Sequence, residues 1–136
     1  MVPHLDAPIV PNTDLEPPEW PADSKIWTLY VDGSSNQADY GAGIVLIDPK
    51  GIECSHCFRF EFKVTNNEAE YEALLAGMKV ATEQGVEYVV VRSDSQLVIN
   101  QVSGTYQARG DNMIAYLRKV QEAAAKFRGL RMEQIP

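Results

Sequence analysis

The sequence has no long apolar run, and none of its 136 residues belongs to a stretch near the length of a membrane helix, about 20 residues. The N-terminus also lacks the basic and then apolar order of a signal peptide. Cysteine is scarce, with only Cys54 and Cys57, so we expect free, reduced thiols rather than a four-ligand zinc site. These absences predict an intracellular protein without a membrane span and leave cytoplasm and nucleus equally open.

Positive charge is missing from the first 24 residues, which hold five acids, no lysine or arginine, and six of the eight prolines. Such a composition is typical of an extended segment that buries little apolar surface. We therefore expect residues 1–24 to form a proline-rich acidic tether and residues 25–136 to form one domain. A docking peptide is the alternative interpretation of the first segment.

The net charge of −7 argues against a nucleic-acid partner, because phosphate binding normally leaves a basic surface. Much of this charge lies in the predicted tether, and the rest of the chain has 14 acids against 12 bases. If several of those acids hold a divalent metal, the working charge of the domain is near neutral. Charge alone therefore does not exclude a nucleic-acid partner.

The apolar pattern predicts an α/β domain with a mixed five-stranded sheet and helices packed on it. The chain order is three hairpin-linked strands, a helix, a strand, two helices and a last strand. Strands are predicted from residue 26 to a glycine turn at 33–36, and over 40–47, 52–63, 86–91 and 130–135. Helices are predicted from a Thr65–Glu68 capping box to Gly85, from the segment 93–96 to about 102, and over 111–128.

Two aspartates stand where an apolar strand gives way to polar residues, Asp32 and Asp94. Because the carboxyl ends of parallel strands meet at one edge of a sheet, we expect these acids to lie close together and to need a cation. Each has another interpretation. Asp32 could stabilise a turn before Gly33, and Asp94 could cap the next helix, although Ser93 with Gln96 three residues on can fill that role.

The helix predicted from residue 65 offers a third acid. Glu68 is accounted for by the capping box, whereas Glu70 shares a face with Ala73 and Gly77, small residues that let a helix lie close to a sheet. Glu72 has no such neighbours. Three carboxylates from two strand ends and a helix predict an oxygen-rich site for Mg²⁺, with Mn²⁺ as the alternative.

Three motifs resemble the type 1 ribonuclease H domain in their order and spacing: Tyr-Val-Asp-Gly-Ser at 30–34, Thr-Asn-Asn-Glu-Ala-Glu at 65–70 and Ser-Asp-Ser-Gln at 93–96. The likeness is closest to the domains of plant gypsy-like LTR retrotransposon polyproteins, where a proline-rich tether follows a reverse transcriptase. It covers about residues 25–136. The resemblance implies the ribonuclease H fold and metal-dependent cleavage of the RNA strand of RNA·DNA hybrids, with Asp32, Glu70 and Asp94 as catalytic and metal-binding acids.

The same resemblance implies a set of contacts to the hybrid. Asn66, Asn67 and Gln96 match residues at the minor groove, where uncharged donors and acceptors can reach a 2′-hydroxyl. Lys63 and Thr65 match a pocket that binds a DNA phosphate. On the RNA side the matching residues are Ser34, Ser35 and Asn36.

The sequence departs from the family pattern at its end, because the family continues into a helix that carries a fourth acid. Glu133 lies too early, in the last predicted strand, to be that acid. We therefore expect a C-terminally incomplete domain that tends to form homodimers. Two functions stay open: a two-metal endoribonuclease, or a catalytically impaired module that binds nucleic acid or is structural. An integrase core shares the fold but orders its acids Asp, Asp, Glu, and it ranks last.

Overall fold

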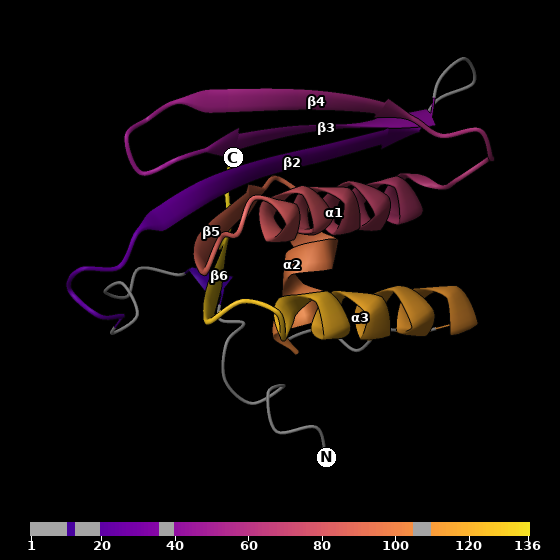
Figure 1. Ribbon diagram of the computed structural model, residues 1–136. Coiled ribbons are helices and arrows are strands. Elements are labelled where there is room, and N and C mark those ends of the chain that lie inside the picture. Colours follow the sequence, from indigo (N-terminus) through magenta and orange to yellow (C-terminus); the bar gives the residue numbers. More distant parts are fainter. Residues whose placement is uncertain (1–10, 13–19, 36–39, 105–109) are drawn as a thin grey trace.

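A mixed sheet with helices on one face forms the body of the protein (Figure 1). The structure is a computed structural model that describes residues 11–12, 20–35, 40–104 and 110–136. Within these ranges the sheet has six strands in the order β1-β6-β5-β2-β3-β4. The strands are β1 (Pro11–Asn12), β2 (Ile26–Ser35), β3 (Tyr40–Ile47), β4 (Glu53–Arg59), β5 (Tyr88–Ser93) and β6 (Gly129–Gln134), and the helices are α1 (Asn66–Glu83), α2 (Gln96–Ser103) and α3 (Asp111–Ala124).

The strand pairing is antiparallel in one half of the sheet and parallel in the other. β3 pairs antiparallel with both β2 and β4, whereas β5 runs parallel to β2 and to β6. The β3–β4 turn is fixed by Asp48, whose Oδ1 accepts from the backbone N–H groups of Lys50 and Ile52, both at 2.9 Å. The predicted five strands and their order along the chain are confirmed.

The core lies between the sheet and the helices, which all cover the same face (Figure 1). Leu29 of β2, Val89 of β5 and Tyr71 of α1 are fully buried there. Because side chains alternate along a strand, the residues between these core positions point to the other face. We call that face, which carries Tyr30, Val45 and Arg92, the outer face.

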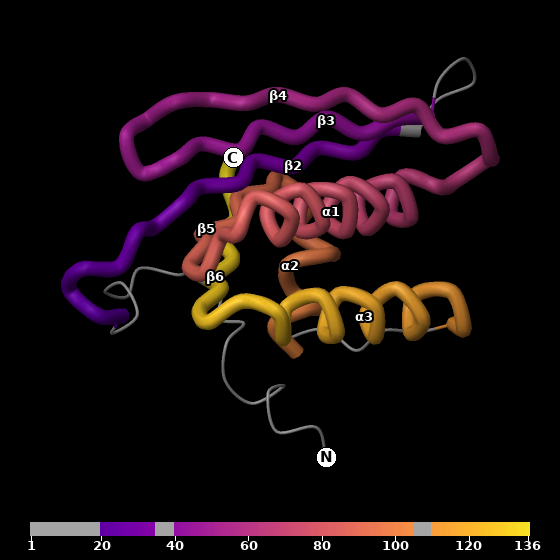
Figure 2. Tube along the Cα trace, in the orientation of Figure 1, coloured from indigo at the N-terminus to yellow at the C-terminus, as the bar shows by residue number. Residues whose placement is uncertain are grey.

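Helix α1 lies close against β2, as its small residues predict. Ala73 is fully buried, and a Cβ atom on Gly77 would come within 2.9 Å of the Leu29 side chain. On its other side α1 runs beside α3 (Figure 2), and the rings of Tyr71 and Tyr116 stack there with centroids 5.5 Å apart. These contacts fix the direction of α1 relative to the sheet.

Several predicted element ends are wrong. The predicted strand 86–91 is shifted by two residues to Tyr88–Ser93, and the predicted helix 111–128 ends at Ala124. β2 continues through Gly33 and Ser34 to Ser35 instead of turning at residue 33, because β3 supplies antiparallel partners as far as Tyr40. β4 ends at Arg59, where pairing with β3 runs out, so Phe62 is 53% exposed rather than on a strand face.

The sequence also missed strand β1, which lies in the segment predicted to be a tether. It pairs parallel with β6 at the sheet edge, a place where proline is tolerated because its missing N–H is not needed by a neighbour. Trp20 packs on Tyr88 with ring centroids 5.2 Å apart. These residues therefore contact the domain, while residues 1–10 and 13–19 of the predicted tether lie outside the described ranges. No helix in the described part has the length and apolar character needed to cross a membrane.

Candidate metal centre

The parallel ladder between β2 and β5 ends just before the two aspartates. It runs from the pair Ile26 and Tyr88 to the pair Tyr30 and Arg92. β2 then pairs only with β3, and β5 continues beside β6. We call the place where β2 and β5 separate the fork. Asp32 lies within β2 at the fork, and it is therefore not the turn residue that the alternative interpretation required.

Glu70 reaches the fork because α1 touches β2 at a glycine. A Cβ atom on Gly33 would lie 2.2 Å from the carbonyl oxygen of Ala69 and 2.6 Å from the backbone nitrogen of Glu70. Only glycine allows this approach. The backbone N–H of Gly33 donates a hydrogen bond to the Glu70 carboxylate, which is thereby held beside Asp32.

The other two glutamates of α1 have separate partners, as the sequence predicts. Glu68 forms the capping box with Thr65: its carboxylate accepts from the Thr65 N–H at 2.8 Å, and its own N–H donates to Thr65 Oγ1 at 3.1 Å. Glu72 accepts a hydrogen bond from the Tyr116 hydroxyl at 2.7 Å, on the side of α3. Glu70 is therefore the glutamate of α1 that lies beside the aspartates, and its role as a metal ligand stays a prediction.

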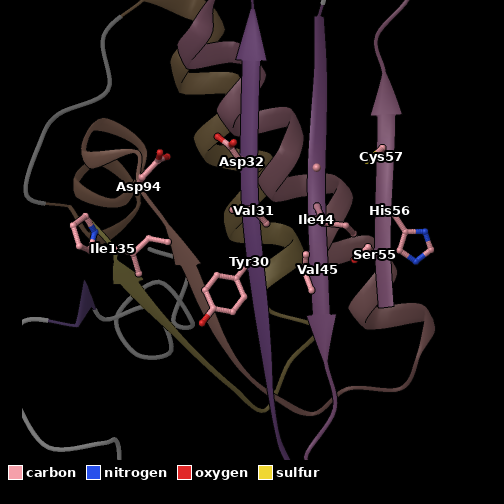
Figure 3. Close-up of a pocket in the computed structure, with 12 residues that line it drawn as sticks. Tyr30, Val31, Asp32, Ile44, Val45, Ser55, His56, Cys57, Asp94 and Ile135 are labelled. Carbon is pink, nitrogen blue, oxygen red and sulfur yellow. The ribbon is translucent and has the colours of Figure 1, made fainter. Parts of the chain in front are cut away.

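The structure brings Asp32, Glu70 and Asp94 together, with one carboxylate oxygen of each within 4.8 Å of the others. The two aspartates are exposed and Glu70 is more enclosed. Figure 3 shows Asp32 on β2 and Asp94 just beyond β5 at the same end of a pocket of about 450 Å³. This pocket lies on the outer face and is lined further down by Tyr30 and Val45.

The electrostatics of this cluster favour a cation. Desolvation, and then the charge of Asp94, raise the pKa of Asp32. Burial is the largest cause that raises the pKa of Glu70 to about 7, and both aspartates add to it, against the lowering effect of hydrogen bonds from Gly33 and Ser95. A divalent ion would relieve this repulsion, and three carboxylate oxygens suit the hard cations Mg²⁺ and Mn²⁺. The donor set therefore fits the metal that the sequence predicts.

Ser95 is a residue of this site that the sequence analysis missed. It is the N-cap of α2, and its Oγ accepts from the Val98 N–H at 3.2 Å. Ser93, which was expected to cap the helix, instead accepts from the Ser95 N–H at 3.1 Å. Both serines precede the helix, and the sequence does not show which one caps it. The structure does, because α2 begins at Gln96 and the residue directly before it is Ser95. Since Ser95 fills the cap, Asp94 does not, and the capping interpretation of Asp94 is wrong.

The predicted hybrid-binding residues are close in sequence to one or another of the three acids. Ser34 is exposed and lines a second pocket of about 440 Å³ together with Asp32 and Arg59. Exposed side chains also stand before and at the start of α1 and at the start of α2: Lys63, Thr65, Asn66, Asn67 and Gln96. The side chain of Ser35 and the whole of Asn36 lie outside the described residues. Contacts of this set with nucleic acid stay a prediction.

Comparison with known proteins gives a family and several relatives. The family model described as reverse transcriptase-like matches residues 30–136. The bifunctional protein Rv2228c of Mycobacterium tuberculosis is 30% identical over 104 residues, which cover 76% of this chain and 28% of that protein. Ribonuclease HI of Halobacterium salinarum is 28% identical over 109 residues, which cover 79% of this chain and 55% of that protein. The chain thus spans only part of the length of these relatives.

Solved structures share the arrangement of strands and helices. RNase H1 from the halophilic archaeon Halobacterium salinarum superposes with a TM-score of 0.71 at 27% identity, over 82% of this chain and 86% of that one. LC11-RNase H1, solved in complex with an RNA/DNA hybrid, gives a TM-score of 0.72 at 27% identity, over 81% of this chain and 85% of that one. The predicted fold, a mixed sheet with helices packed on it, is therefore confirmed.

Proposed function

The chain belongs to the reverse transcriptase-like family, and we propose that it is a metal-dependent endoribonuclease that cleaves the RNA strand of RNA·DNA hybrids. The observation that carries the proposal is the convergence of Asp32, Glu70 and Asp94 at the fork, with carboxylate oxygens within 4.8 Å of one another. Support comes from the similarity to ribonuclease HI and to LC11-RNase H1, which was solved with an RNA/DNA hybrid.

The proposed cofactor is Mg²⁺, with Mn²⁺ as a substitute, held by Asp32, Glu70 and Asp94. Bound there, the metal would supply Lewis-acid activation of the scissile phosphate and lower the pKa of the attacking water. The protein contributes a rigid set of oxygens. Asp32 is fixed by pairing of β2 with β3, and Glu70 by the N–H of Gly33 and the hydroxyl of Ser95.

The proposed hybrid contacts come from the exposed polar residues next to these acids. Asn66 and Asn67 at the start of α1 and Gln96 at the start of α2 would read the minor groove, where 2′-hydroxyls distinguish RNA from DNA. Lys63 and Thr65 would bind a DNA phosphate, and the Thr65 hydroxyl can donate its proton there because the capping bond uses only its oxygen as acceptor. On the RNA side the proposal includes Ser34, Ser35 and Asn36.

We extend the proposal to the setting in which the domain acts. Its three motifs at 30–34, 65–70 and 93–96 support an origin in a plant gypsy-like LTR retrotransposon polyprotein, with a reverse transcriptase domain as partner and an intracellular site of action. That enzyme makes hybrids, so a hybrid ribonuclease beside it would have its substrate at hand. Pairing with a second copy of this chain stays a prediction, which light scattering can check.

The test is a cleavage assay on one RNA sequence presented as single strand, RNA duplex and RNA·DNA hybrid, with DNA duplex as a further substrate. We expect Mg²⁺-dependent cutting of the RNA in the hybrid alone, and none after Asp94→Asn. Hybrid binding without cutting would instead support the impaired, nucleic-acid-binding module. Equal cutting of single-stranded RNA would refute the substrate assignment.

A further inference from the structure

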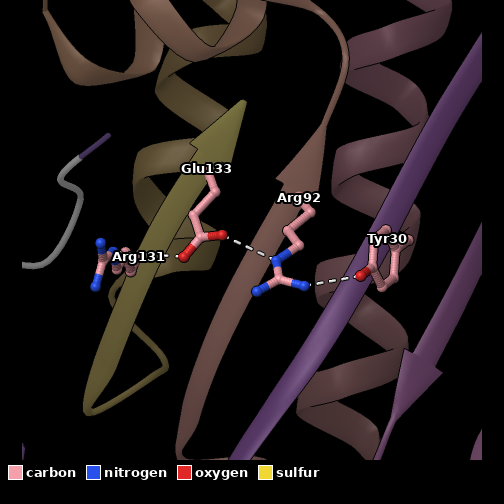
Figure 4. Close-up of polar contacts among 4 residues, drawn as sticks. All are labelled: Tyr30, Arg92, Arg131 and Glu133. Atoms are coloured by element: carbon pink, nitrogen blue, oxygen red, sulfur yellow. Dashed lines mark hydrogen bonds and ion pairs between the residues drawn. The ribbon is translucent and has the colours of Figure 1, made fainter. Parts of the chain in front are cut away.

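A row of three polar side chains crosses the outer face of the sheet directly before the fork (Figure 4). Tyr30, Arg92 and Glu133 are register partners on β2, β5 and β6. Arg92 Nη1 donates to the Tyr30 hydroxyl at 2.8 Å, and Arg92 Nε donates to Glu133 Oε1 at 2.9 Å. One guanidinium group thus joins three neighbouring strands, and we call these three residues the cross-strand row.

The cross-strand row lies directly before the two aspartates of the metal centre. Tyr30 and Arg92 form the last pair of the β2–β5 ladder, and Asp32 and Asp94 each follow two residues later. Beyond this pair the ladder does not hold the two strands together. The Arg92–Tyr30 hydrogen bond is therefore a side-chain link between β2 and β5 at the last register pair before the carboxylates.

The row is less exposed than an ordinary surface ion pair, although the side chain of its central residue, Arg92, is 36% exposed. The Glu133 side chain is 16% exposed, and its second oxygen lies 3.7 Å from Nε of Arg131, whose side chain is 9% exposed. Glu87 and Arg128 stand directly before β5 and β6, at the ends of these strands away from the row. They form an ion pair at 3.0 Å, but their side chains are 60% and 72% exposed. Ion pairs this exposed contribute little to stability, so Arg128 provides a matched control.

We propose that Arg92, held by Glu133 and bonded to Tyr30, is a positioning residue of the metal centre. It keeps the diverging ends of β2 and β5 at the separation at which Asp32 and Asp94 can share a cation. The inference rests on the proposed function, because it requires metal binding at these carboxylates. Arg92 itself contacts no reacting atom in this scheme and acts through the strands that carry the acids.

Charge and positioning predict opposite signs for the loss of Arg92. A nearby cation repels a metal ion, so an effect of charge alone would make metal binding tighter when Arg92 is removed. Loss of a group that orients metal ligands instead weakens metal binding, by about 10–100-fold in known sites. Tyr30→Phe tests the positioning effect without the charge effect, since it removes the hydroxyl that bonds Arg92 and leaves the charge of the protein unchanged.

The experiment measures the Mn²⁺ dissociation constant by electron paramagnetic resonance of free Mn²⁺, and urea unfolding in EDTA alongside it. The variants are Tyr30→Phe, Arg92→Met, Arg92→Lys and the control Arg128→Met. We expect about tenfold weaker binding for the first three, because each breaks the link from Arg92 to Tyr30 or to Glu133. Arg92→Lys belongs with them because lysine keeps the charge but lacks the planar guanidinium that donates to both partners at once. The double variant Tyr30→Phe with Arg92→Met should bind no more weakly than Arg92→Met alone, and Arg128→Met should bind like the wild type.

The failures can be told apart. Wild-type Mn²⁺ affinity in Tyr30→Phe, or tighter binding in Arg92→Met, would overturn the positioning role and leave the metal centre standing. Lower unfolding free energy with unchanged Mn²⁺ affinity would also overturn it, because the row would then be merely structural. No Mn²⁺ binding by the wild type would refute the proposed function, and the positioning role with it.

Discussion

The backbone N–H of Gly33 donates a hydrogen bond to the carboxylate of Glu70, 37 residues further along the chain. The contact requires a glycine, because a Cβ atom at this position would overlap backbone atoms of α1 at 2.2 Å and 2.6 Å. It joins the strand that carries Asp32 to the helix that carries Glu70. The geometry of the metal centre therefore depends on a residue without a side chain.

Substitution of that glycine should damage fold and site together. Gly33→Ala forces α1 away from β2, and we expect a loss of about 3 kcal/mol in the free energy of unfolding, the upper part of the range for overpacking. Gly43→Ala is the matched control, since Gly43 is the register partner of Asp32 on β3 and a Cβ there meets nothing within 4 Å. Urea unfolding measures both. Equal stabilities of the two variants would mean that the close approach at Gly33 is not needed.

Two neighbouring glutamates of α1 should respond differently to the same change. Glu70→Gln removes a metal-binding charge, so hybrid cleavage should fall to background. Glu68→Gln keeps an oxygen for the capping box and should retain activity, with a stability cost below the ~1 kcal/mol of a lost cap. Initial cleavage rates at a matched folded fraction decide the matter. Comparable loss in both variants would show that the wrong acid has been assigned.

The raised pKa of Glu70 predicts how stability depends on pH without metal. Its ordinary value is 4.5 and burial and the two aspartates raise it to about 7, so between these values the folded state binds more protons than the unfolded state. The contribution of Glu70 to the free energy of unfolding must then fall as pH rises from about 4.5 to 7. Glu70→Gln should remove this fall and be more stable than the wild type at pH 8 in EDTA.

The check is urea unfolding of both proteins at pH 5 and pH 8, with and without Mg²⁺. Added Mg²⁺ should stabilise the wild type at pH 8, because it binds the folded state, and have little effect on Glu70→Gln. If the two proteins show the same difference between pH 5 and pH 8, Glu70 does not titrate in this window.

A buried hydrogen bond away from the acids offers a test of stability alone. The Tyr71 hydroxyl donates to Gln101 Oε1 at 2.6 Å, and both residues are buried between α1 and α2. Tyr71→Phe leaves the Gln101 oxygen without this donor, which should cost about 1–3 kcal/mol. Mn²⁺ affinity of the folded protein should not change. A large loss of affinity would show that the packing of α2 sets the site.

The sequence predicted the parts of this structure that depend on local pattern. The capping box of Thr65 and Glu68, the small face of Ala73 and Gly77, and the three acids follow from residue type and spacing, and the structure brings them together as expected. The capping box and the small face are readable because each depends on neighbours within a few residues in the chain, whereas the meeting of the three acids was predicted from where parallel strands end and from the family resemblance.

The features that were missed depend on partners far away in the chain. β2 extends to Ser35 because of β3, β4 stops at Arg59 because its partner ends, and the short β1 exists only beside β6. The cross-strand row was likewise hidden, because Arg92 is 62 residues from Tyr30 and 41 from Glu133. Only strand order and register, which a single sequence does not supply, place these residues side by side.

Mn²⁺ titration of the wild type and of Asp32→Asn tests the central claim, which is that the three carboxylates at the fork together form a binding site for divalent metal. The substitution keeps the shape of the side chain and removes one charge, and groups that orient or supply metal ligands change affinity by about tenfold or more. We expect saturable binding by the wild type, competition by Mg²⁺, and at least tenfold weaker binding by Asp32→Asn. Identical binding curves for the two proteins would contradict the assignment of the metal to this site.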